Sequence, residues 1–220
     1  MHADSVAGAN LKTPKAAAIA GIVFSILLLI AFSMLRLSLP ADPLDPGAWL
    51  QTSSSTIALA LNMVPFAGIA FLWFMGVLRD RLGQREDRFV ATVFFGSGLL
   101  FLGMLFVAAA IIGAILIAFA VRPEHVINSA TLYIARATAY NLVNIYMIKM
   151  AAVFMITTST LAFAVGFLPR WLVLAGYGLA LLVLAGSYWL SWSFVVFPVW
   201  VFLVSTCILM DKAERNAQVA

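Results

Sequence analysis

Long apolar runs divided by short polar segments dominate this sequence, and they restrict its fold more than any other feature. A run of about 20 apolar residues is the length at which one helix crosses the hydrocarbon core of a bilayer. The chain contains six candidate runs, at 16–37, 56–78, 89–121, 141–167, 171–188 and 194–210. Only 10% of its residues are charged, against about 25% in soluble domains. The sequence therefore predicts an all-α integral membrane protein, a bundle of six transmembrane helices.

The basic residues predict the orientation of this bundle, because cytoplasmic loops carry an excess of lysine and arginine. Nine of the 13 basic residues fall in the two tails, in the mixed-charge run RDRLGQREDR (79–88) and after the fourth span. The other four are Arg36, Arg122, Arg136 and Lys149. We therefore expect a multi-pass protein of the cell membrane with both termini in the cytoplasm. It would form one domain over 1–220, with tails at 1–15 and 211–220 around a six-span bundle at 16–210.

The third and fourth predicted helices are expected to be longer than the bilayer. The run 89–121 would extend about 50 Å as a helix, against a hydrocarbon core of about 30 Å. Residues 124–140 could continue the fourth helix in a projecting hairpin, belong to strongly tilted helices, or lie along the membrane interface. Prolines predict an irregular loop over 38–55, and YWLSWS (188–193) predicts a tight turn at headgroup depth.

A polar stripe is predicted on the fourth helix. Helical spacing brings Tyr146, Lys149, Thr157 and Thr160 to one face, and Lys149 is a costly charge within an apolar run. Arg136 and two further arginines fall on the same outer side, which favours an anion as the ligand of a pathway or pocket. The alternative is that the threonines bond their own helix carbonyls while Lys149 reaches the headgroups.

Small residues form a second stripe, on the third predicted helix. Gly96, Gly103, Ala110 and Ala114 share one face, and small residues let membrane helices approach closely. This candidate packing seam has two interpretations. It packs against another helix of the same bundle, or it forms an interface between subunits.

The chemistry of the spans argues against an enzyme. No predicted span contains a carboxylate, and the histidines and acids do not have the spacing of metal ligands. We therefore expect no catalytic residues, no cofactor and no metal. The basic residues sit in short segments between the spans, which is typical of membrane topology and not of nucleic-acid binding.

Two functions remain. The first is a small homo-oligomeric channel or transporter, with the polar stripe lining the route of an anion. The alternative is a non-enzymatic accessory or scaffold subunit of a larger membrane complex. The expected partners are the lipid bilayer, an anionic lipid, and either further copies of the chain or another membrane protein.

Overall fold

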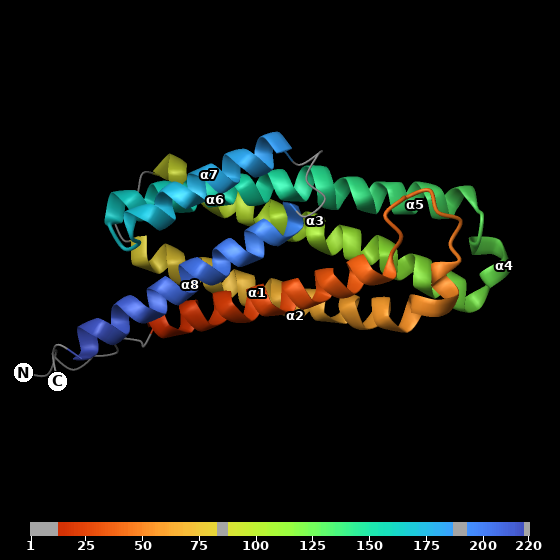
Figure 1. Cartoon of the computed structure of the whole chain (residues 1–220), viewed down its shortest axis with the longest axis horizontal. Helices are drawn as coiled ribbons and strands as arrows, with labels where there is room; N and C mark the ends of the chain where they lie inside the picture. Colours follow the sequence, from red (N-terminus) through yellow and green to blue (C-terminus); the bar gives the residue numbers. More distant parts are fainter. Residues whose placement is uncertain (1–12, 83–87, 187–192, 218–220) are drawn as a thin grey trace, which may run out of the picture.

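The computed structural model of the protein describes residues 13–82, 88–186 and 193–217, and the regular structure of these segments is entirely helical. This confirms the all-α prediction (Figure 1). The helices are α1 (Thr13–Ser38), α2 (Trp49–Leu82), α3 (Arg88–Val121), α4 (Pro123–Val126), α5 (Ala130–Asn141), the π-helical segment η2 (Leu142–Met147), α6 (Ile148–Val165), α7 (Arg170–Gly186) and α8 (Ser193–Ala217).

Five helical stretches of the described chain are long and apolar enough to cross a membrane. They are Ala18–Ser38, Trp49–Arg79, Phe89–Val121, Ala130–Val165 and Ser193–Met210. The fifth predicted span, 171–188, corresponds to α7, which has 17 residues and is shorter than the usual 20 or so. The structure is thus that of a helical membrane protein with five candidate spans, and the predicted count of six is not confirmed.

The region before the second span was predicted wrongly in part. The irregular loop ends at residue 48, because α2 already begins at Trp49 and not near residue 56. The prolines that break the chain stop at Pro46, and nothing in the sequence WLQTSSST that follows prevents a helix.

The structure shows how residues 124–140 connect to the fourth predicted helix. After the short α4, Ser129 caps α5, since its Oγ accepts a hydrogen bond from the Leu132 N–H at 3.1 Å. The helix then continues through η2 into α6. Residues 130–141 therefore extend the fourth helix.

Several predictions concern residues outside the described segments. These are the parts of the tails at 1–12 and 218–220, the central part of the 79–88 run at 83–87, and the first five residues of the YWLSWS turn, at 188–192. Of the predicted turn, Ser193 is described and is the first residue of α8.

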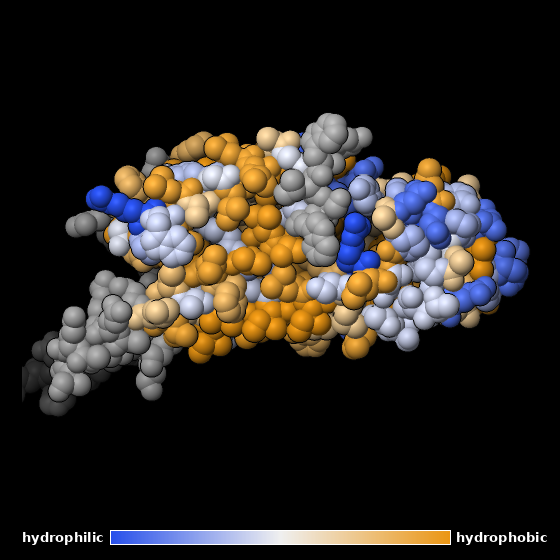
Figure 2. All heavy atoms as spheres, viewed as in Figure 1, coloured by the Kyte–Doolittle hydropathy of each residue, from blue (hydrophilic) through white to orange (hydrophobic). Residues whose placement is uncertain are grey.

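The two ends of the elongated molecule differ in character. α1 begins and α8 ends at one end, at the left of Figure 1, where α6 also turns into α7. The other end consists of α4, α5, the neighbouring ends of α2 and α3, and the loop between α1 and α2. Figure 2 shows a hydrophobic surface over the middle of the bundle and a mostly hydrophilic surface over the end that holds α4 and α5. The long axis of the bundle therefore runs from an apolar body to a polar end.

Phenylalanines fill the centre of the apolar body. The ring of Phe71 in α2 lies with its centroid 4.7 Å from Phe24, 5.4 Å from Phe101, 5.2 Å from Phe154 and 5.7 Å from Phe197. These rings come from α1, α3, α6 and α8, and all are buried. Tilted and edge-on arrangements of this kind are favourable for aromatic rings. The cluster therefore joins five helices and closes the interior of the bundle at this level.

A glycine allows α7 to pack closely on the bundle despite its short length. Gly176 is buried, and a Cβ atom at this position would collide with Ser159 Oγ of α6 and lie 3.0 Å from Trp200 Nε1 of α8. Such small residues are typical of close helix contacts in membranes. α7 is therefore an integral part of the bundle.

Candidate functional site

The loop between α1 and α2 is folded by its own aspartates and fixed to the polar end. Oδ1 of Asp42 and of Asp45 each accepts a hydrogen bond from the backbone N–H two residues later, at 2.8 and 2.9 Å. Gly47 has a φ of +100° and packs against α5, which leaves no room for a side chain. The Pro46 carbonyl accepts a hydrogen bond of 3.0 Å from the Asn128 N–H. The loop is therefore held in a defined shape above α5.

A cavity of about 150 Å³ lies where this loop meets α1, α2, α3 and α5. Its polar lining consists of Arg36, Arg136, Tyr140, Asn144 and the turn at Pro40. Its apolar lining includes Phe32, Leu61, Val64, Leu105, Ile112 and Phe194. An apolar cavity of about this size holds a benzene-sized molecule in other proteins. The cavity is therefore large enough for a small ligand and has one polar side.

Arg136 of α5 is the most unusual residue of this lining. Its exposed fraction is 6%, its Nη2 donates a hydrogen bond of 3.0 Å to the Pro40 carbonyl, and its Cζ lies 5.0 Å from the centroid of the Trp49 ring. Its Nη1 is buried and has no hydrogen-bond partner in the described part of the chain, and the same holds for Trp49 Nε1. A buried charge with an unsatisfied donor is costly. Arg136 in the cavity lining and Trp49 beside it therefore each have a buried donor without an acceptor among the described residues.

Nearby charges compensate Arg136 only in part. Asp42 and Asp45 interact with it electrostatically. However, the one ion pair within 4.0 Å among the described residues joins His125 and Glu124 on the exposed α4. The aspartates therefore lower the local net charge without supplying the missing acceptor. Arg36, in the last turn of α1, adds a second guanidinium to the cavity lining.

The π-helical segment η2 lies beside the cavity. π-helical turns interrupt α-helices rarely and are frequent at functional sites. Here Val143 and Asn144 line the cavity, and Asn144 Nδ2 donates a hydrogen bond of 2.9 Å to the Tyr140 carbonyl. The irregular turn therefore places the amide of Asn144 on the polar side of the cavity, next to Tyr140 in the last turn of α5.

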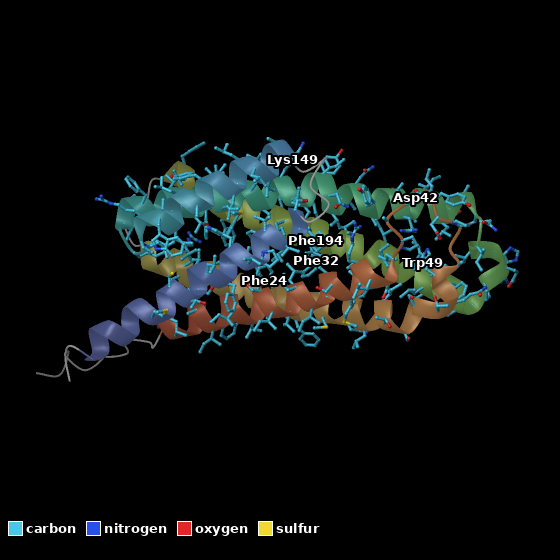
Figure 3. All side chains as sticks on the ribbon, in the orientation of Figure 1. Phe24, Phe32, Asp42, Trp49, Lys149 and Phe194 are labelled. Atoms are coloured by element: carbon cyan, nitrogen blue, oxygen red, sulfur yellow. The ribbon has the colours of Figure 1, made fainter. Side chains whose placement is uncertain are left out.

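The predicted polar stripe is divided among different environments. Tyr146 and Lys149 are exposed, and Figure 3 shows Lys149 at the edge of the bundle. Thr157 is buried and bonds a carbonyl one turn earlier at 3.0 Å. Thr160 does the same at 2.9 Å and also contacts the Tyr177 hydroxyl at 2.8 Å. These contacts agree with the alternative in which the threonines bond their own helix.

The stripe and Arg136 do not form one site. Arg136 lines the cavity, whereas none of the four stripe residues does. Of the residues singled out in the sequence as an anion site, the structure therefore places only Arg136 in the lining of this cavity. Arg36 was noted only as an outer basic residue. Tyr140 and Asn144 were missed, since no pattern in the sequence marks the end of α5 and the π-helical turn that follows it as part of a cavity.

Among the described residues, no helix packs closely on the glycines of the predicted seam of α3. A Cβ atom at Gly96 or at Gly103 would meet nothing within 4 Å, and Ala110 and Ala114 are exposed. The described residues therefore give no support to packing of this seam inside the bundle, and that interpretation stays a prediction. The subunit-interface interpretation stays a prediction.

No family model, curated protein or solved structure matches this chain. Within the described residues, no group of three or more histidine, cysteine or acidic side chains could hold a metal ion. The assignment of a function therefore depends on the geometry of the cavity at the polar end.

Proposed function

We propose that this chain is a non-enzymatic, multi-pass protein of the cell membrane that binds an anionic group in the cavity beside Arg136. One observation carries the proposal: a guanidinium with an exposed fraction of 6% lines a cavity while one of its nitrogens has no acceptor among the described residues. Guanidinium groups pair with carboxylates and phosphates through two parallel hydrogen bonds. An anion would supply the acceptor and offset the cost of burying the charge.

The proposed membrane frame has six spans, with α7 as the shortest, and both termini in the cytoplasm. The close packing of α7 through Gly176 supports its inclusion. The nine-to-four distribution of basic residues supports the orientation. α3 and the helix from α5 to α6 would be longer than the bilayer, since 34 residues of α3 rise about 50 Å. The hydrophilic end in Figure 2 would then lie beyond the outer leaflet.

The centre of the bundle favours a protein that binds an anion over one that transports it. An anion that crossed the membrane inside one chain would have to pass the phenylalanine cluster around Phe71, which offers no polar group. We therefore place the accessory role ahead of the channel or transporter. Anion flux into liposomes that carry the purified protein would reverse this order.

A second candidate role, self-assembly through α3, is favoured by a separate observation. The most apolar 18-residue window of α3 has 17% of its residues buried, against 39% to 56% in the four other candidate spans. Its exposed face carries Gly96 and Gly103, where two helix backbones could approach closely. A homo-oligomer with α3 at its interface would cover this face.

Replacing Arg136 by methionine tests the proposed function. Arg136→Met keeps a long side chain but removes the charge and the donors, and a charged hydrogen bond contributes about 1.5–3 kcal/mol. We expect octyl phosphate to bind the variant at least about tenfold more weakly than it binds the wild type. Binding would be measured with the protein in nanodiscs of neutral lipid and corrected with empty nanodiscs.

Lys149→Met is the matched control, because it removes a cation from the same membrane helix outside the cavity. It should leave octyl phosphate binding unchanged. Equal losses in both variants would indicate a general surface effect and contradict the assignment. Wild-type affinity in a folded Arg136→Met protein would also exclude it.

A further inference from the structure

The cavity lies at the boundary between the apolar body and the polar end. Figure 3 shows Phe32 and Phe194 near the middle of the molecule, with Trp49 and Asp42 farther toward the end that holds α4. The rings of Phe32 and Phe194 lie 5.5 Å apart, and both line the cavity. The cavity therefore has an aromatic, apolar side toward the membrane and a polar side toward the loop.

The structure assigns a ligand class to this cavity: we infer that it binds an anionic amphiphile, with its headgroup at Arg136 and Arg36 and its alkyl chain between α1, α2 and α3. This inference rests on the proposed anion site and names its ligand. The apolar lining from Phe32, Leu61, Val64, Leu105 and Ile112 supplies hydrocarbon contacts that an inorganic anion would not use. A small anion alone would leave this larger, apolar part of the cavity without a partner.

The charge balance of the polar side limits how much affinity an anionic group alone can provide. Asp42 and Asp45 partly offset the charge of Arg136, so the attraction for any anionic group is reduced. The headgroup would satisfy the donor of Arg136 locally, while the alkyl chain would add affinity through burial of apolar surface. Burial of one methylene group strengthens binding about fourfold.

A series of alkyl phosphates of increasing length tests this inference. Inorganic phosphate and butyl, hexyl and octyl phosphate would be titrated into the full-length protein in neutral-lipid nanodiscs, with free ligand concentrations measured. We expect affinity to rise about fourfold per methylene while the chain fills the cavity, hence about 15-fold from butyl to hexyl phosphate. We also expect octanol, which has the chain without the charge, to bind at least about tenfold more weakly than octyl phosphate.

Variants with larger side chains in the cavity lining provide a second test of this inference. Ala109→Leu and, independently, Val143→Phe enlarge side chains that line the cavity and are only partly buried. Each should weaken octyl phosphate binding about tenfold, the equivalent of losing nearly two buried methylene groups, and should weaken inorganic phosphate binding by a smaller factor. Thermal unfolding shows whether each variant has folded. If one of them has not, the other provides the test.

The outcomes separate the ligand class from the anion site itself. Equal affinities for inorganic and octyl phosphate, both lost in Arg136→Met, would overturn the amphiphile and leave the anion site. Equal affinities for octanol and octyl phosphate, unaffected by Arg136→Met, would overturn both. Competition in nanodiscs that contain phosphatidylglycerol then identifies the source: displacement of octyl phosphate indicates a bilayer phospholipid, and its retention indicates a free single-chain amphiphile.

Discussion

Replacing Phe71 by alanine is expected to lower the free energy of unfolding by about 3 kcal/mol, because Phe→Ala changes in protein cores cost about 3–5 kcal/mol. The ring contacts phenylalanines from α1, α3, α6 and α8 and is fully buried. Its removal would leave a void, and each of these helices would lose its dispersion contacts with the missing ring. The low end of the range applies, since an unfolded chain in a membrane already keeps its apolar side chains out of water.

Phe66→Ala is the control for this prediction. Phe66 belongs to the same helix but is 65% exposed, so its loss should change stability by at most about 0.5 kcal/mol. Unfolding of both variants in mixed micelles with increasing denaturing detergent would provide the comparison. Similar losses for the two variants would show that the cluster around Phe71 does not join the helices.

Gly103→Leu is expected to abolish assembly of the protein into a homo-oligomer while leaving the fold of each chain intact. The position faces open space in the single chain, so a leucine fits there without strain. At an interface between α3 helices, the same leucine would hold the two backbones apart. Mass measurement of the protein in detergent, together with its thermal unfolding, would report both effects.

The neighbouring Leu102 gives the opposite pattern. It is 4% exposed, and Leu102→Ala should lower the free energy of unfolding by about 2–3 kcal/mol with no change in the number of subunits. If Gly103→Leu has the mass and the melting behaviour of the wild type, the exposed face of α3 contacts lipid and the proposed assembly is wrong.

The sequence was sufficient for the membrane class and the helix positions because both depend on local properties. Apolar runs of membrane-span length need no knowledge of neighbours, and three of the five candidate spans match predicted runs to within two residues at both ends. The start of α2 was placed too late, since the breaking effect of the prolines was extended beyond Pro46. The length of α7, with 17 residues, could not be judged because the predicted span ran into the YWLSWS segment.

The site was less predictable because it depends on contacts between distant segments. Helical spacing singled out Lys149, but spacing alone does not decide which face of a helix is covered, and Lys149 is exposed. Arg136 was identified as a candidate from its charge. Its burial depends on Pro40, 96 positions away in the chain, and on the Trp49 ring. Such a contact has no signature in a single sequence.

Photochemical labelling of the cavity would test the account most directly. An octyl phosphate with a diazirine at the end of its chain would be activated on the wild-type protein in neutral-lipid nanodiscs, and the labelled residues mapped by mass spectrometry. We predict labels on the cavity walls, at Phe32 of α1 and at Leu105 or Ile112 of α3. These labels should disappear in excess octyl phosphate and in the Arg136→Met variant. Labels confined to exposed apolar residues such as Trp73 and Leu100, with no competition by octyl phosphate, would contradict the proposed site.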